Sequence, residues 1–235
     1  MKAWLKLTAM FFGIALLSGC STGLTLPHGP DIYSLSMKPN APKVVVARVA
    51  DNRQDKQHLG SISALQVQMK ADPTELVAKE MVAALYDQDV NGVLGRVSAT
   101  DSPDTLAAAA AENNADGVLV VSIQALAIAS FDALMDPPTA TATLTATLYD
   151  SAGQKLDSDS AMGQVQRRIN TFVAEKSTGE LLNEAIRAAT QKLAASSIIS
   201  TLKNKAAAPE TEPEAATTET QTTTTTETTT EAPAQ

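Results

Sequence analysis

The stretch TATATLTATLYD, residues 139–150, alternates between polar and apolar side chains with a period of two. In an extended strand its five threonines lie on one face, and its alanines and leucines lie on the other. A shift of the register by one residue would turn the threonines into the core, so the pairing of this strand is well specified. The pattern predicts a strand with one face in the core and the other toward solvent.

The segments around this strand predict a sheet. The sequence ADGVLVVSIQALAI, residues 115–128, begins with β-branched residues and then alternates, which favours a strand that runs from the centre of a sheet to a solvated end. The turn signal DSAG begins at residue 150, and residues 154–166 predict a weaker strand that pairs with the first one. The sequence KVVVARVAD, residues 43–51, predicts an early and mostly buried strand.

Three further segments predict helices. Asp72 caps a helix over residues 73–86, where apolar side chains recur every four residues. A second helix begins at the Ser102-Pro103 pair and ends near residues 113 and 114. The sequence STGE, residues 177–180, fits a capping box that opens a third helix, which runs to about residue 201.

The order of these elements is strand, helix, helix, strand, strand, strand, helix. It predicts an α+β fold with a small, mostly antiparallel sheet and with amphipathic helices packed on one face. Gly92 and Gly95, in the sequence NGVLGR, are interpreted as turn glycines. A layered α/β fold stays open as the alternative, because the second helix leads almost directly into the strand that begins at Ala115.

The N-terminus has the pattern of a bacterial export signal. Lys2 and Lys6 precede the uncharged run LTAMFFGIALL, residues 7–17, which is shorter than the roughly 20 residues of a membrane-spanning helix. The sequence LSGC, which ends at Cys20, resembles a lipobox, in which the chain is cleaved before the cysteine and the cysteine receives acyl chains such as palmitate. Several acyl chains hold a protein at its membrane permanently. An ordinary signal peptide with an incidental cysteine is the alternative.

Cys20 is also the only cysteine of the chain. No intramolecular disulfide can therefore form, and after lipidation no thiol is left for catalysis. The next residue is Ser21 and not an aspartate. By resemblance to the sorting of enterobacterial lipoproteins, this implies transport to the outer membrane, and we expect the domain to face the periplasm.

Composition divides the chain into four parts. Residues 1–19 are the predicted signal peptide, residues 20–42 are the lipidated N-terminus with a linker, and residues 43–203 are the α+β lipoprotein domain. Residues 204–235 are rich in threonine, glutamate and proline, and no large apolar side chain occurs from Ala206 onward, which predicts a disordered acidic tail. A glycosylated stalk that reaches toward the cell wall is the alternative interpretation.

The charge balance excludes one class of partner. The chain has 18 Lys and Arg against 26 Asp and Glu, which gives a formal net charge of −8. Six of the acids lie in the last 30 residues, so the part of the chain before the tail is only mildly acidic. No basic face indicates a nucleic acid partner.

The sequence has no pattern of a catalytic or metal-binding site. The two histidines, His28 and His58, have no second ligand at the spacing of a zinc site, so we expect no metal and no cofactor. No nucleophile elbow, phosphate-binding loop or dinucleotide-binding glycine pattern occurs. We therefore expect a protein that is not an enzyme. A hydrolase that uses His58 with Asp51 or Asp55 stays a further alternative, although no nucleophile lies nearby in the sequence.

The densest polar cluster follows the first predicted strand, where loops commonly bind ligands. It is the sequence DNRQDKQH, with Asp51, Arg53, Asp55, Lys56 and His58. One interpretation is a loop that contacts a ligand or a partner, in which Arg53 meets a phosphate or carboxylate in a bidentate manner. The other is a solvated loop in which Asp51 pairs with Arg53 or caps the turn.

A second candidate loop, FDALMDPP, separates two predicted strands at residues 131–138. Its two prolines exclude a central strand at this position. Phe131, Leu134 and Met135 predict an apolar tip that contacts a membrane or a partner protein. Alternatively, the same side chains pack back over the edge of the sheet.

The combination of features resembles the YajG-type bacterial outer-membrane lipoproteins, and more loosely the lipoprotein subunits of envelope lipid transporters. The resemblance rests on the lipobox, on a first strand that runs into Asp51-Asn52-Arg53 with Leu59-Gly60 a few residues on, and on the order of strands and helices. It covers roughly residues 15–200. The Thr-rich tail and the long loop at residues 54–70 depart from the pattern.

Together these observations predict a membrane-anchored envelope lipoprotein that acts as a non-enzymatic binding or scaffolding module. The expected partner is another envelope protein, a lipid or a cell-wall component. The alternative is an auxiliary lipoprotein subunit of an envelope lipid or solute transporter. In that case the apolar faces of the helices and the sheet would form a groove for an apolar ligand.

Overall fold

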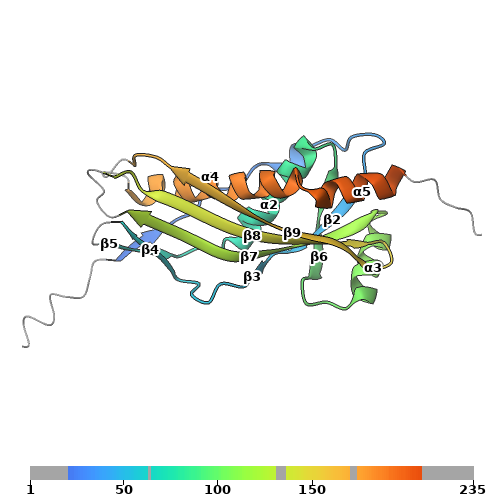
Figure 1. Cartoon of the computed structure of the whole chain (residues 1–235), viewed down its shortest axis with the longest axis horizontal. Coiled ribbons are helices and arrows are strands. Elements are labelled where there is room, and N and C mark those ends of the chain that lie inside the picture. The colour runs from blue at the N-terminus through green and yellow to red at the C-terminus, as the bar shows by residue number, and fades with distance from the viewer. Residues whose placement is uncertain (1–20, 63–64, 131–135, 170–173, 208–235) are drawn as a thin grey trace, which may run out of the picture.

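The computed structural model describes residues 21–62, 65–130, 136–169 and 174–207, which form a nine-stranded sheet with helices on both faces (Figure 1). The strands are β1 (Ser21–Leu24), β2 (Lys43–Arg48), β3 (Ala50–Asp51), β4 (His58–Ile62), β5 (Leu65–Met69), β6 (Asn91–Ser98), β7 (Gly117–Ser130), β8 (Thr139–Asp150) and β9 (Lys155–Gln166). The helices are the 3-10 helix η1 (Ile32–Ser34), α2 (Thr74–Asp87), α3 (Pro103–Glu112), α4 (Ala174–Ala194) and α5 (Ser197–Ala207).

The long strand β7 organises the sheet. Along one side it pairs with β8 in an antiparallel register, and β9 continues this antiparallel half. Along its other side β7 pairs in turn with β2, β3 and β4, all of which run parallel to it. β2 then pairs with β6, and β4 leads through β5 to β1. The three branches of the described sheet therefore end at β1, β6 and β9.

This sheet is mixed, so the prediction of a mostly antiparallel sheet is wrong. The difference comes from β6, which was predicted as a turn, and from the parallel pairing of β2, β3 and β4 with β7. The connection from β2 to β6 runs through β3, β4, β5 and helix α2, and α3 connects β6 to β7. Long crossover connections of this kind allow the connected strands to run parallel. Gly95 lies within β6, close to β2, and a Cβ atom at this position would collide with the Val45 side chain. The glycine thus permits close packing and does not mark a turn.

The helices pack on both faces of the sheet, which corrects the predicted arrangement on one face. Val44 and Val46 of β2 point into the larger core cluster, where α2, α4 and α5 cover the sheet. Val45 and Ala47 of the same strand point into a second cluster with α3. β2 is buried on both faces, as its unbroken apolar sequence predicts. In Figure 1, α4 and α5 lie end to end along the long strands.

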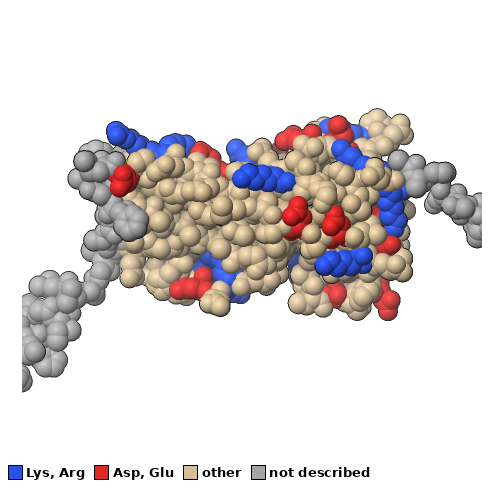
Figure 2. All heavy atoms as spheres, viewed as in Figure 1, with Lys and Arg blue, Asp and Glu red and all other residues tan. Residues whose placement is uncertain are grey.

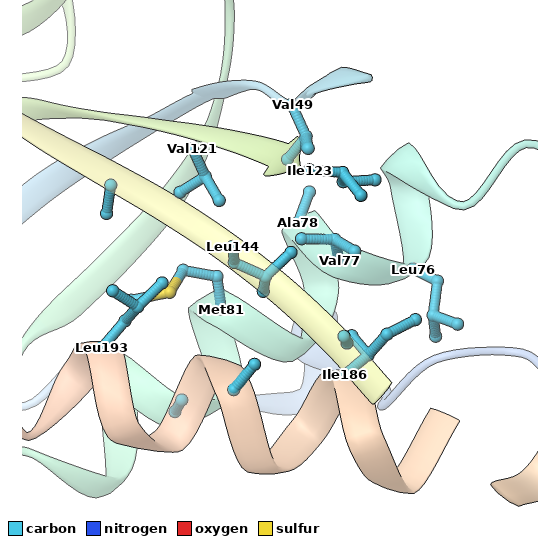
Figure 3. Close-up of a cluster of buried hydrophobic side chains, with 14 of the residues drawn as sticks. Val49, Leu76, Val77, Ala78, Met81, Val121, Ile123, Leu144, Ile186 and Leu193 are labelled. Carbon is cyan, nitrogen blue, oxygen red and sulfur yellow. The ribbon is translucent and has the colours of Figure 1, made fainter. Parts of the chain in front are cut away.

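The larger core joins α2 and α4 to the long strands. In Figure 3, Met81 of α2 and Leu193 of α4 lie next to each other on the same side of β8, close to Leu144. These three side chains are buried, and burial of each contributes about 1.5–3 kcal/mol relative to an exposed side chain. Glu80 of α2 is also buried, and both of its carboxylate oxygens accept hydrogen bonds from Arg187 of α4 at 3.1 Å. The two helices are therefore joined by a charged pair as well as by apolar contacts.

The predicted element bounds hold best where one amphipathic pattern dominates. β8 covers the predicted residues 139–150, and α2 and α3 lie within a residue of their predicted ranges. The last predicted helix, residues 177–201, is in fact two helices, α4 and α5, which meet at residues 195 and 196. The capping-box interpretation of residues 177–180 is wrong, because α4 already begins at Ala174. Among the described helices, none is both long and apolar enough to cross a membrane.

The folded part begins before residue 43. Ser21–Leu24, placed by the sequence analysis in a linker, forms β1 and pairs in parallel with β5. The side chain of Leu24 is only 1% exposed, because it lies in the larger core. The hairpin of β4 and β5 supplies the strand to which β1 pairs, and this hairpin lies in the segment that was predicted to be a loop. The predicted signal peptide, Cys20 and the acidic tail beyond residue 207 lie outside the described residues.

Candidate functional site

The predicted polar loop contains a buried ion pair. Arg53 donates from Nε to Oδ1 of Asp51 at 2.9 Å and from Nη2 to Oδ2 at 2.8 Å. Its side chain is 4% exposed, and Nη2 also reaches the carbonyl oxygen of Lys56. Burial would raise the pKa of the Asp51 carboxyl, but the hydrogen bonds and charge of Arg53 outweigh it and hold that pKa below its ordinary value. The guanidinium that the sequence offers to a ligand already binds a carboxylate of the chain.

The second half of this loop is organised by Asp55. Its carboxylate accepts hydrogen bonds from the backbone N–H groups of His58 and Gln57 at 2.9 Å each, and these bonds hold the pKa of Asp55 below its ordinary value. The other oxygen lies 2.9 Å from Nδ1 of His58. The loop thus divides into two internal pairs, Asp51 with Arg53 and Asp55 with His58. As a site for a ligand or a partner, it stays a prediction.

Two other candidates lie outside the described residues. These are the apolar tip with Phe131, Leu134 and Met135, and the lipidation site Cys20. Over the part of the chain that the structure describes, no group of three His, Cys, Asp or Glu side chains is arranged to hold a metal ion.

The outer face of β7, β8 and β9 is broad and has few charged side chains at its centre (Figure 2). The threonines of β8 lie on this face and are half-buried. Their hydroxyl groups bond to neighbouring strands, as between Thr145 and Ser122 at 2.7 Å and between Thr147 and Ser158 at 3.0 Å. The hydroxyl groups of Thr145 and Thr147 are therefore satisfied within the sheet.

The structure shows a different candidate, which is a groove along the edge strand β6. One hollow of about 360 Å³ lies between the η1 segment, the second half of α2 and the first half of β6. A second hollow of about 300 Å³ lies between the end of β2, the first half of α2 and the middle of β6. Leu94 lines both hollows. We call the two hollows together with the outer edge of β6 the β6 groove.

Large apolar side chains are exposed around the first hollow. Tyr33 is 83% exposed, Met37 is 58% exposed and Leu94 is 38% exposed, and all three line it. They come from two segments more than 50 residues apart in the sequence. Among the described residues, only Met162 on β9 is a further large apolar side chain with comparable exposure. A concentration of this kind on a protein surface marks an interaction site more often than single exposed residues do.

A buried amide fixes the segment that forms one wall of this hollow. The Asn91 side chain, at the start of β6, accepts from the backbone N–H of Lys38 at 2.8 Å and donates to the Lys38 carbonyl at 2.9 Å. Lys38 Nζ lies 4.2 Å from the centre of the Tyr86 ring and 2.7 Å from Oδ1 of Asp89. The Lys38 ammonium holds the pKa of Asp89 below its ordinary value. These contacts attach the segment before β2 to α2 and β6.

The second hollow has a basic end. Arg48 lines it, and Arg96 lies on the same face of β6 as Leu94, two residues further along the strand. Both arginines are exposed, and neither forms an ion pair with a residue that the structure describes. Glu75 lines the same hollow but lies 2.7 Å from Nζ of Lys79. Two arginines without a described ion-pair partner therefore lie near the end of β6, together with one acid, Asp101, which accepts a hydrogen bond from the N–H of Ser98 at 2.7 Å.

Comparison with known proteins gives structural neighbours only. No protein-family model and no curated protein matches the sequence. A crystal structure of a Xanthomonas campestris protein with the family model DUF330 is 13% identical, covers 79% of this chain and 98% of its own, and has a TM-score of 0.47. PelC from Paraburkholderia phytofirmans, a dodecamer, is 13% identical, covers 75% of this chain and 96% of its own, and has a TM-score of 0.42.

A third neighbour is lipoprotein GNA1162 from Neisseria meningitidis. It is 15% identical, covers 66% of this chain and 99% of its own, and has a TM-score of 0.40. Of these three structures, GNA1162 is the one described as a lipoprotein. The more specific resemblance to YajG-type lipoproteins stays a prediction.

The sequence contains only a weak signal for the β6 groove. Tyr33, Met37 and Leu94 are isolated apolar residues in segments interpreted as a linker and a turn. The one feature that could have identified β6 is the alternation of Val93, Gly95 and Val97 with Leu94 and Arg96, which has the period of a strand. Two glycines in six residues conceal that alternation.

Proposed function

We propose that this protein is a lipid-anchored envelope lipoprotein that works as a non-enzymatic binding module, and that the β6 groove is its contact surface. The observation that carries the proposal is the meeting of an open strand edge with two adjoining hollows and exposed apolar side chains. The partner best suited to this surface is an extended segment of another envelope protein.

Strand addition explains how such a surface would bind. An added strand would form main-chain hydrogen bonds with the outer edge of β6, and the hollows would receive alternate side chains on the α2 side. Apolar side chains fit beside Tyr33, Met37 and Leu94. An acidic side chain fits the basic end, where Arg48 and Arg96 have no described partner.

The proposed anchor lies at a different edge of the sheet. β1 begins at Ser21, directly after the predicted lipidated residue Cys20. Because the strand order ends with β1 on one branch and β6 on another, lipids at Cys20 would fix the β1 edge near the membrane and leave the β6 groove accessible. The lipobox supports the anchor, and the serine after it supports the outer membrane with the domain facing the periplasm.

Photo-crosslinking in intact cells tests the contact surface. A photoreactive amino acid at Met37 or Leu94 is expected to give a discrete crosslinked protein, whereas the same group at Met162 on β9 is expected to give none. Met162 is the matched control because its side chain is 50% exposed. Equal yields at all three positions, or no crosslinked protein at any of them, would overturn the proposal.

Labelling with a fatty acid tests the anchor separately. Label is expected on the natural chain and not on the Cys20→Ala variant, which should also leave the membrane fraction. Label that persists in the variant would show that the sulfur is not the attachment site.

A second candidate is an auxiliary subunit of an envelope transporter that binds an apolar ligand. The volume of the first hollow, about 360 Å³, lies at the lower end of the range of small-molecule sites. Native mass spectrometry of gently extracted protein would then show a bound lipid, and Leu94→Asp would remove it. A spectrum of the natural chain without added mass would contradict this candidate.

A further inference from the structure

In the β6 groove, the outer edge of β6 has no paired strand and Arg48 and Arg96 have no ion-pair partner among the described residues. β6 pairs only with β2 in the described sheet, so its outer edge is open from Gly92 to Val97, whereas the N–H of Ser98 donates to Asp101. Arg48 and Arg96 lie near its end, and the acid in the adjoining hollow, Glu75, is already bound by Lys79. An occupant of this edge therefore needs to be extended and acidic.

The chain itself contains a segment with these properties. Residues 217–231 read TTETQTTTTTETTTE, and β-branched threonine favours the extended conformation. Alternate residues of a strand lie on the same face. If the segment forms a strand, Glu219, Glu227 and Glu231 therefore lie on one face, because they are even numbers of residues apart. Residues 208–235 contain six glutamates and no lysine or arginine, so their charge is complementary to the basic end of the groove.

The C-terminal segment leaves the fold beside the start of β6. Lys203 of α5 lines a hollow with Pro42, the residue before β2, and Asp89, two residues before β6. The 28 residues that follow Ala207 can span up to roughly 90 Å, whereas a strand of eight residues is about 26 Å long. The segment can therefore enter at Asn91 and extend along the whole edge toward Ser98.

We propose that residues 217–231 of the same chain add to the outer edge of β6 as a further strand, with Glu227 and Glu231 beside Arg96 and Arg48. This inference rests on the proposed function in one respect, because the segment would occupy the proposed contact surface. A partner would then have to displace the segment before it could bind. A tether of this length raises the local concentration of the segment to the millimolar range, so even a weak strand pairing is well populated. Because exposed ion pairs are weak and are screened by salt, the occupant is readily displaced.

Hydrogen exchange of the full chain, purified without lipid and without any partner, tests this pairing. Amide exchange over residues 91–98 is expected to be roughly fivefold slower in the natural chain than in a variant with Glu219→Lys, Glu227→Lys and Glu231→Lys. The matched control is Glu210→Lys with Glu212→Lys and Glu214→Lys, which makes the same change of charge outside the segment and should keep the slow exchange. A variant with Thr223→Pro and Thr225→Pro should lose the protection without a change of charge.

A charge exchange gives the second readout. Arg96→Glu alone is expected to speed exchange over residues 91–98, and Arg96→Glu combined with the three lysine substitutions in the segment is expected to restore slow exchange. Equal exchange rates in all variants would overturn the proposal. Protection that rises with protein concentration would assign the occupant to a second copy and would also overturn it. Neither result bears on the crosslinking at Met37 and Leu94, so the failure of this proposal is distinguishable from the failure of the proposed function.

Discussion

β6 and β9 are both edge strands of one sheet, but they differ in how many of their outward N–H groups have a side-chain acceptor. On β9, the N–H groups of Ser158 and Ser160 donate to the carboxylates of the preceding Asp157 and Asp159, at 2.7 Å each. Because alternate residues of an edge strand face outward, these acids occupy the positions at which another strand would bind. On β6, the N–H of the last residue, Ser98, donates to Asp101 at 2.7 Å, but no described side chain accepts a hydrogen bond from the N–H groups of residues 92–97.

The same contrast applies to the covering helices. α4 lies directly on β9, so closely that a Cβ atom at Gly163 would collide with the backbone at Ala185 and Ala189. α2 lies beside β6 but leaves two hollows along it. Edge strands that are covered or carry charges resist pairing with further strands, and an uncovered edge permits it. The comparison indicates that β9 ends the sheet, whereas β6 is available for binding.

The largest expected change in stability comes from a substitution that forces α4 away from β9. Gly163→Leu is expected to lower the free energy of unfolding by about 3 kcal/mol, because the helix backbone at this contact cannot move without disturbing the core. Urea denaturation followed by circular dichroism measures this change. Gln164→Leu, at the neighbouring exposed position, is the control and should change stability by no more than about 0.5 kcal/mol. Equal costs for the two substitutions would contradict the close contact.

The next effect depends on pH and concerns the turn between β8 and β9. Burial would raise the pKa of Asp150, but the hydrogen bond and charge of Lys205 and the N–H groups of Gln154 and Ala152 outweigh it and lower that pKa. A carboxyl with a lowered folded pKa stabilises the fold above the unfolded value near about pH 4, and the stabilisation is lost as the pH falls through the folded value.

Asp150→Asn is therefore expected to cost roughly 2 kcal/mol at neutral pH and much less near pH 2. Denaturation curves at several pH values measure the difference between the natural chain and the variant. Asp89→Asn, which removes the exposed partner of Lys38 on the β6 side, is the control and should cause no measurable change. A cost for Asp150→Asn that is the same at both pH values would refute the assignment.

A smaller change in stability should accompany the opening of the β9 edge. Asp157→Ala with Asp159→Ala removes the two acceptors, and we expect a loss of roughly 1 kcal/mol together with self-association of the protein. Sedimentation velocity over a range of concentrations detects the association. Asp157→Asn with Asp159→Asn keeps a side-chain oxygen at each position and should stay monomeric. If the alanine variant is also monomeric, the carboxylates do not protect this edge.

The smallest change in stability should come from substitutions in the β6 groove. Tyr33→Ser and Met37→Ser replace exposed side chains, so each should change the free energy of unfolding by no more than about 0.5 kcal/mol. Each should nevertheless lower the crosslinking yield at Leu94 severalfold, because the apolar wall of the first hollow is lost. An unchanged yield at natural stability would exclude these side chains from the contact surface.

The antiparallel half of the fold could be predicted because its information is local. Each residue of β8 has a side chain that suits only one of the two faces, so the sequence specifies both the strand and its register. The same holds for α2, where the predicted apolar residues Val77, Met81 and Leu85 are all fully buried. The pairing of Asp51 with Arg53 was one of two interpretations of the polar loop, but the burial of that pair depends on β7 and Met69, which are distant in sequence.

The sequence by itself determined the predicted export signal and lipid attachment at Cys20, the long hairpin strands and the amphipathic helices, because these depend on composition and on the period of neighbouring side chains. Only the tertiary structure decided the parallel branches of the sheet, the place of α3 on the second face and the β6 groove. The physical reason is that each of these depends on contacts between distant segments. Gly95 in β6 leaves room for Val45 of β2, and Asn91 holds the segment with Tyr33 and Met37 against β6.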